Sequence, residues 1–134
     1  MTEIAVSDTH ALLWYARAEW QKLGRDARRV YTAADEGRAA IYIPTLTLVE
    51  LSEAGRRGSI RFADGFARWT TRLFSSGRFF PAELTTEIVI RAAALYAIPE
   101  RADRLIAATA AHLELPLLTR DPAIGRASGV EVVW

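Results

Sequence analysis

The sequence predicts an α/β fold, namely a three-layer α/β/α sandwich around a parallel sheet of about five strands. Three observations lead to this prediction. Short apolar runs typical of buried strands alternate with longer stretches of helical periodicity. The chain contains no internal repeat, low-complexity segment or linker. Its 134 residues, 51% hydrophobic and 25% charged, suit one compact domain spanning residues 1–134. Such alternation places helices on both faces of a parallel sheet.

Five runs have the character of strands, because they are short, apolar and separated by helical stretches. They are Glu3–Ser7, Ala40–Ile43, Arg78–Phe80, Leu117–Thr119 and Val130–Val133.

Six stretches carry helical periodicity and are ended or spaced by Gly or Pro. They run from Thr9 to about Trp20, Asp26–Glu36, Thr45–Ala54, Phe62–Phe74, Thr86–Tyr96 and Arg101–Glu114. The first begins directly after Asp8, whose side chain can accept hydrogen bonds from the free N–H groups of the first helical turn. Capping is therefore one interpretation of Asp8.

Composition limits the chemistry that the chain can perform. There is no cysteine, which excludes disulfides and thiolate metal sites, so a metal would be held by oxygen or by His10 and His112. Oxygen ligands are the better expectation. There is no secretory signal, and no apolar run approaches the roughly 20 residues of a membrane span, so we expect a cytoplasmic protein without membrane contact.

Four of the sixteen acidic residues stand where a ligand site is expected. In an open parallel sheet the ligand crevice lies beyond the carboxyl ends of the strands. Asp8 ends the first strand, and Asp121 follows the fourth in "LPLLTRD". Asp103 lies near the start of the helix "ERADRLIAATAAH", and Glu50 lies between apolar residues of a helix that reads as largely buried.

Each acid also has a simpler interpretation. Asp103 could pair with Arg104 or cap its helix, Asp121 before a proline could form a turn or cap, and Glu50 could face solvent beside Glu53. Taken together, the four acids indicate a cation site. Carboxylates in one crevice would repel by about 3 kcal/mol per pair at roughly 5 Å and an effective dielectric of about 20. A bound cation would make that arrangement stable, and oxygen ligands select Mg²⁺ or Mn²⁺.

Basic residues are concentrated in one segment. Of the 17 basic residues 16 are Arg, and residues 56–78 contain six of them against the single acid Asp64. An apolar stripe at helical spacing comprises Phe62, Phe66, Trp69 and Leu73, and is either core or a partner contact. A separate face carries Arg61, Arg68 and Arg72. That face is either solvated or binds RNA phosphates, since the guanidinium group matches phosphate geometry.

Four segments together resemble the PIN-domain ribonucleases, and most closely the VapC-type toxins of bacterial toxin–antitoxin pairs. The segments are "DTHALLW", "TLVELSEAGRRGSI", "ADRLIAATAAHLELPLLTRD" and "VEVVW". The resemblance covers essentially the whole chain, and "DRLIAATA…LPLLTRD" is its most specific part. It implies a Mg²⁺-dependent endoribonuclease, with Mn²⁺ as the alternative ion, which hydrolyses RNA phosphodiester bonds. It also implies a cognate antitoxin and a homodimer, for which the apolar stripe offers a contact surface.

The resemblance also implies roles for individual residues. The catalytic acids are Asp8, Glu50, Asp103 and Asp121. From the needs of phosphodiester hydrolysis we expect Asp8 and Asp103 to bind the metal directly, and Asp121 to bind it or a second metal, directly or through water. Glu50 orients or deprotonates the attacking water. Thr119 is the hydroxyl that supports the acids, and Thr9 carries over more weakly.

The chain departs from the family pattern just before the helix that holds Asp103. Members often read Asp-Pro-x-Asp-Arg there, whereas this chain reads "ERADR" from Glu100. Glu100 is therefore either a further member of the site or plain surface. Two other functions stay open. One is a catalytically silent PIN domain that binds RNA or protein. The other is a phosphotransferase or phosphatase with Asp8 as nucleophile, which would call for a second Asp where this chain has His10.

Overall fold

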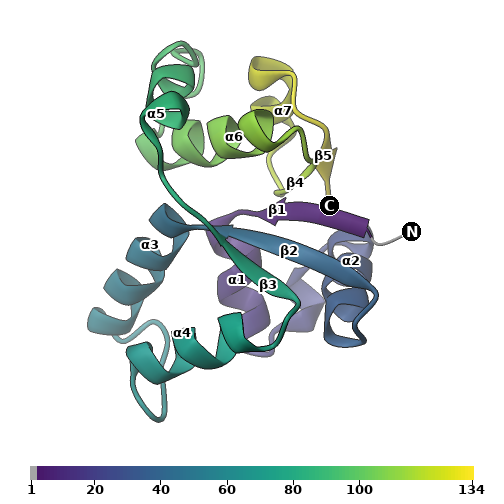
Figure 1. Ribbon diagram of the computed structural model, residues 1–134, viewed down its shortest axis with the longest axis vertical. Helices are drawn as coiled ribbons and strands as arrows, with labels where there is room; N and C mark the ends of the chain where they lie inside the picture. The colour runs from purple at the N-terminus through teal and green to yellow at the C-terminus, as the bar shows by residue number, and fades with distance from the viewer. Residues whose placement is uncertain (1–2) are drawn as a thin grey trace.

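The computed structural model describes residues 3–134 and has five parallel strands between helices (Figure 1). The strands are β1 (Glu3–Ser7), β2 (Ala39–Pro44), β3 (Phe79–Ala82), β4 (Leu117–Leu118) and β5 (Val132–Val133). The helices are α1 (Thr9–Ala16), α2 (Arg25–Asp35), α3 (Thr45–Arg56), α4 (Phe66–Ser75), α5 (Thr86–Ala93), α6 (Arg101–Leu113) and α7 (Pro122–Ser128), with a 3₁₀ turn η1 (Trp20–Lys22). The predicted fold class is confirmed.

The order of strands is β3-β2-β1-β4-β5, so β1 lies at the centre of the sheet. Val6 of β1 is in register with Tyr42 of β2 and with Leu117 of β4. Because β1 and β4 are neighbours and parallel, the residues that follow them emerge side by side at one edge of the sheet. This confirms the adjacency on which the predicted crevice depends.

The two faces of the sheet are covered by different helices, as alternation along parallel strands requires. Ala5, Ile41 and Phe79 point to the face that packs with α1 and α2. Val6 and Leu117 point to the opposite face, where α6 and α7 cover them. Helix α3 contacts both α1 and α6, so it closes the carboxyl end of the sheet (Figure 1).

Three predicted helices are shorter than expected, two of them for backbone reasons. Helix α1 ends at Ala16 rather than near Trp20, because Ala18 takes a left-handed conformation with φ 55° and the chain continues into η1. Helix α4 begins at Phe66 rather than at residue 62, because Gly65 precedes it with φ 91°, a conformation that glycine adopts readily. Helix α5 ends at Ala93, short of residue 96.

One helix was not predicted from the sequence. Helix α7 follows β4 at once, with Asp121 as its N-cap and Pro122 in its first turn. Both are standard signals of a helix start, but the helix has only 7 residues and one buried side chain, Ile124. Its apolar periodicity is therefore too short to recognise.

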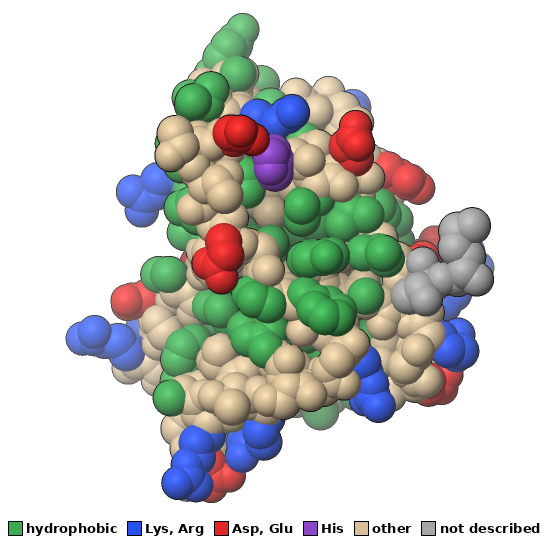
Figure 2. All heavy atoms as spheres, viewed as in Figure 1, with side chains coloured by type: hydrophobic (Ala, Val, Ile, Leu, Met, Phe, Trp, Pro, Cys, Tyr) green, Lys and Arg blue, Asp and Glu red, His purple; other side chains and the backbone are tan. Residues whose placement is uncertain are grey.

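The aromatic stripe turns out to belong to the interior. Phe62, Phe66 and Trp69 are half-buried, contact one another with ring centroids 5.1–6.2 Å apart, and pack against the main core. Of the two interpretations of the stripe, packing against the core is confirmed, and a partner contact by its half-exposed part stays a prediction. The exposed large apolar side chains of the described residues lie on β1, α3, β3 and around α5; they are Ile4, Val49, Phe80, Leu84, Val89, Ile90 and Tyr96. Figure 2 shows hydrophobic side chains gathered across the middle of this view.

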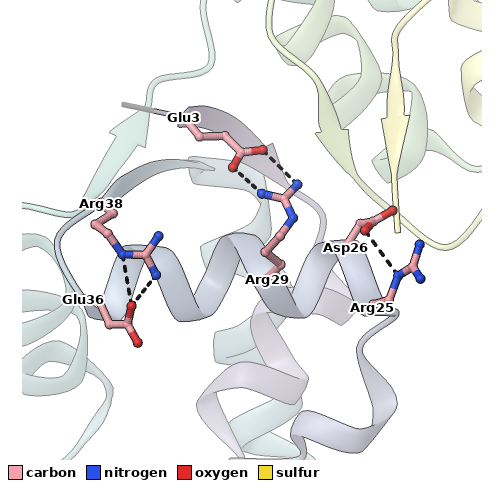
Figure 3. A network of polar contacts seen from close by, with 6 residues as sticks. All are labelled: Glu3, Arg25, Asp26, Arg29, Glu36 and Arg38. Atoms are coloured by element: carbon pink, nitrogen blue, oxygen red, sulfur yellow. Dashed lines mark hydrogen bonds and ion pairs between the residues drawn. The ribbon is translucent and has the colours of Figure 1, made fainter. Parts of the chain in front are cut away.

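Helix α2 carries a row of surface ion pairs (Figure 3). The Arg29 guanidinium binds both carboxylate oxygens of Glu3, at 2.7 and 3.3 Å, and so ties α2 to the start of β1. These exposed pairs add little to stability, because water screens them. No helix within residues 3–134 has the length and hydropathy needed to cross a membrane.

Candidate active site

Asp8 links β1 to α1 and performs the capping role that its position allows. Its carboxylate accepts a hydrogen bond from the backbone N–H of Ala11 at 2.8 Å. Burial raises the pKa of Asp8, while the Ala11 N–H, the Thr119 hydroxyl and His10 lower it, and the Asp103 carboxylate raises it further. The cap therefore places a partly desolvated carboxylate at the central strand's carboxyl end.

Thr119 and Asp121 follow β4 beside it. The backbone N–H of Asp8 donates to the carbonyl of Leu118 at 3.1 Å, which fixes the two strand ends together. Thr119 is 2% exposed, and its hydroxyl accepts from the N–H of Asp121 at 3.4 Å. The Asp121 carboxylate caps α7 by accepting from the N–H of Ala123 at 2.9 Å. Capping and a place in the crevice are thus compatible for this residue as well.

Asp103 lies in the first turn of α6 and makes no hydrogen bond or ion pair within residues 3–134. The alternative pairing with Arg104 is wrong, because the Arg104 guanidinium instead donates to the carbonyls of Ile98 and Pro99, at 2.8 Å each. The pKa of Asp103 is raised, first by burial and then by the carboxylates of Glu50, Asp121 and Glu100, whereas His10 lowers it. Its charge is therefore poorly compensated.

Glu50 is turned inward. It is half-buried, and its carboxylate accepts a hydrogen bond from the hydroxyl of Thr9 in the first turn of α1. Its neighbour Glu53, three residues along the same helix, is exposed. The alternative in which Glu50 faces solvent beside Glu53 is therefore wrong.

Three adjoining hollows bring the four acids to one groove. The first, of about 410 Å³, is lined by Asp8, Asp103 and Asp121 together with His10, Thr119 and Arg120. The second, of about 160 Å³, shares Asp8, His10 and Asp103 with the first and adds Thr9, Glu50 and Arg57. The third, of about 340 Å³, shares Glu50 and Arg57 with the second and extends to Glu53, Glu100 and Arg101. We refer to these hollows together as the acidic groove.

The donor set of the acidic groove fits a hard divalent cation. Its oxygens come from carboxylates and from the Thr9 and Thr119 hydroxyls, which suit Mg²⁺ or Mn²⁺. Within residues 3–134 no three His, Asp or Glu side chains already converge at ligand distance, so binding would require the carboxylates to rotate inward. Burial, and to a smaller extent the neighbouring carboxylates, raise the pKa values of Asp8 and Asp103, and a bound cation would favour their charged forms.

Three groove residues were not among the predicted site residues, although His10 was considered as a metal ligand. His10 lines the first two hollows, and its ring centroid lies 5.6 Å from that of Trp14. Arg120 stands between Thr119 and Asp121, and Arg57 follows Glu50 by seven residues, which is two helical turns. Those spacings were visible in the sequence and could have pointed to both arginines.

The Arg residues predicted to bind RNA are not in the acidic groove. Arg61 precedes α4 rather than sharing its face, and it lines a separate hollow of about 610 Å³. Arg72 forms an ion pair with Asp64 at 3.1 Å, and Arg68 is exposed. The prediction that they share one helical face is wrong for Arg61. Their contact with RNA stays a prediction.

The sequence model of the PIN domain matches residues 5–130 of the chain. No curated protein sequence matches this chain significantly. Similar solved structures include VapBC2 from Rickettsia felis bound to a DNA fragment from their promoter, 14% identical over 96% of each chain with a TM-score of 0.70. A toxin–antitoxin complex from Klebsiella pneumoniae is 23% identical, with 90% of this chain and 89% of the other covered and a TM-score of 0.61. FitAcB from Neisseria gonorrhoeae is 19% identical, with 96% and 95% covered and a TM-score of 0.65. At these identities the likeness establishes the fold.

Proposed function

The chain belongs to the PIN-domain family, and from that premise we propose that it is a metal-dependent endoribonuclease acting as the toxin of a toxin–antitoxin pair. The observation that carries the proposal is the acidic groove, in which β1, α3, α6 and the end of β4 each contribute one acid. The toxin assignment is supported by the likeness to solved toxin–antitoxin complexes.

The proposed roles follow from position. Asp8 and Asp103 would hold Mg²⁺ or Mn²⁺ directly, because both line the two inner hollows and both carry raised pKa values. Asp121, which lines the first hollow but not the second, would hold this ion or a second one, directly or through a water. When bound, the ion would neutralise nonbridging phosphate oxygens and make water more acidic.

The remaining side chains would activate the attacking water or hold the carboxylates in position. Glu50 would orient the attacking water and accept its proton, with Thr9 holding the carboxylate in place. Thr119, which is buried, would hold the Asp8 carboxylate and the backbone of Asp121 in position. Glu100 lies in the outer hollow and would act only through its charge.

A growth experiment tests the toxin assignment. Expression of the wild-type chain in a bacterial host should arrest growth, and expression of Asp103→Asn at the same level should not. Coexpression of the protein encoded beside this gene should restore growth if it is the antitoxin. Normal growth of cells that accumulate the soluble wild-type chain would contradict the proposal.

The proposal also names the binding partners of the protein and the cellular compartment in which it acts. RNA is the substrate, an antitoxin covers the acidic groove, and two copies form a homodimer. A toxin that cuts cellular RNA acts in the cytoplasm, which agrees with the composition of the chain. The proposal assigns this activity to a single domain, residues 1–134.

A further inference from the structure

An RNA strand that enters the acidic groove meets repulsion from its walls. Asp8, Asp103 and Asp121 line the first hollow, and Glu50, Glu53 and Glu100 line the outermost one together with two arginines. A bound divalent ion compensates only the charge closest to it. Phosphates on either side of that point need cationic side chains at the rim.

Arg120 stands at one end of the two inner hollows. It lines the first hollow with Asp8, Asp103 and Asp121, and it makes no ion pair within residues 3–134. Its guanidinium carbon lies 5.3 Å from the centroid of the Trp14 ring. Trp14 is itself fixed, being 8% exposed and 5.7 Å from the ring of Trp134. The aromatic ring therefore holds the planar cation at the rim without neutralising it.

Arg57 stands at the other end. It is the C-cap residue of α3, and it lines the second hollow with Asp8, Glu50 and Asp103. It is exposed and, among the residues that the structure describes, it has no ion-pair partner. Asp8 and Asp103 line both inner hollows, whereas Arg120 lines only the first of the two and Arg57 only the second.

Among the residues that the structure describes, the other arginines either have a side-chain partner or lie away from the two inner hollows. Arg29 and Arg72 pair with Glu3 and Asp64, and Arg104 binds backbone carbonyls. Arg101 is exposed but lines only the outer hollow. Arg57 and Arg120 therefore combine a free guanidinium with a place beside the inner carboxylates.

We propose that Arg57 and Arg120 bind two phosphates of a single RNA strand, one on each side of the phosphate that lies over Asp8 and Asp103. This inference rests on the proposed ribonuclease function and assigns the residues that position its substrate. Phosphate contacts of this kind fix the register of the strand without reading its bases.

Binding measured apart from cleavage tests this proposal. A fluorescently labelled single-stranded RNA 12-mer of mixed sequence is titrated with full-length protein carrying Asp8→Asn, in Mg²⁺, over a series of salt concentrations. Arg57→Gln and Arg120→Gln are added separately to this background. Arg28→Gln is the matched control, because Arg28 is exposed on α2 and lines none of the three hollows.

Each groove variant should weaken binding about fivefold, and the slope of log K against log salt should flatten by up to about 0.7 per residue. Arg28→Gln should change neither. Arg120→Lys should bind more weakly than the parent because it keeps the charge but loses the planar contact with Trp14, whereas Arg57→Lys should bind nearly as well as the parent.

The outcomes separate the two hypotheses. If the parent binds RNA and Arg57→Gln and Arg120→Gln bind as Arg28→Gln does, the phosphate contacts are refuted while the ribonuclease function stands. If Arg120→Lys matches the parent, Trp14 has no role in placing Arg120. If the wild-type chain neither binds nor cleaves RNA, the proposed function and this inference fail together. Circular dichroism of each variant confirms the fold.

Discussion

The hydroxyl of Thr9 donates a hydrogen bond to the carboxylate of Glu50, although the two residues lie 41 positions apart in the sequence. This contact joins the first turn of α1 to the middle of α3. It turns Glu50 away from solvent and toward Asp8 and Asp103, with which it lines the second hollow. A threonine therefore determines where the proposed water-activating carboxylate points.

Removal of this hydrogen bond should slow catalysis more than it weakens binding. In Thr9→Val the Glu50 carboxylate loses its donor, and we expect kcat to fall by about 10-fold to 100-fold, as for other residues that orient a ligand or base. Thr9→Ser keeps the hydroxyl and should retain most of the activity. Steady-state kinetics on one RNA substrate measure both. Equal activity of the Val and Ser variants would show that the contact has no catalytic role.

Asp103→Asn should stabilise the metal-free protein at neutral pH. Because the pKa of Asp103 is raised above 3.8 in the folded state, the folded state holds this proton more tightly than the unfolded chain does. Its contribution to the free energy of unfolding therefore falls as pH rises from about 3.8 through the raised pKa, and the loss persists at neutral pH. The substitution removes that loss, which we expect to be about 1 kcal/mol.

Urea unfolding in a chelator at several pH values measures this difference between wild type and variant. Groups common to both proteins cancel in the comparison. Glu53→Gln, at an exposed position on α3, is the control and should leave the pH profile unchanged. An Asp103→Asn profile that coincides with that of the wild type would show that burial and the neighbouring carboxylates do not raise the pKa of Asp103.

The proposed homodimer should form through the apolar surface of α5 and its neighbours rather than through the aromatic stripe. Val89 and Ile90 are 47% and 66% exposed, and Leu84 just before the helix is 45% exposed. Ile90→Glu should therefore shift the wild-type dimer to monomer in light scattering, whereas Ala67→Glu on the exposed side of α4 should not. A dimer that survives Ile90→Glu would place the contact elsewhere.

Local signals predicted the architecture well, because each strand is a short apolar run next to a Gly, Pro or cap residue. The ends of α1 and α4 could not be read, since they depend on φ values of Ala18 and Gly65 that the surrounding contacts set. Likewise, the apolar periodicity of Phe62, Phe66 and Trp69 shows that one side is buried but not against what.

The positions of the four acids were predictable, but their surroundings were not. Strand order placed Asp8 and Asp121 at one edge, as expected from adjacent parallel strands. Glu50 is oriented by its hydrogen bond with Thr9. Asp103 has no ion-pair partner because the neighbouring Arg104 binds backbone carbonyls instead. Such contacts depend on side chains that meet only in the folded chain, so no periodic pattern in the sequence predicts them.

A separate prediction concerns the arginines outside the groove. If Arg61 and Arg68 bind RNA phosphates beyond the groove, converting Arg61, Arg68 and Arg72 to Gln should lower the salt slope of RNA binding by up to about 0.7 for each arginine that binds a phosphate. We expect the smallest share from Arg72, because Asp64 already pairs with it. Titrations in an Asp8→Asn background measure the slope. An unchanged slope would mean that these arginines do not bind RNA and serve solubility or contact the antitoxin instead.

Cleavage of RNA by the purified chain, followed over a Mg²⁺ titration, tests the central claim most directly. The account predicts that wild type and Glu53→Gln cut RNA in Mg²⁺ or Mn²⁺ and stop when a chelator is added. It also predicts that Asp8→Asn and Asp103→Asn lose at least about 100-fold in rate while remaining folded. RNA binding without metal-dependent cleavage by the wild type, or near-normal cleavage by both Asn variants, would contradict it.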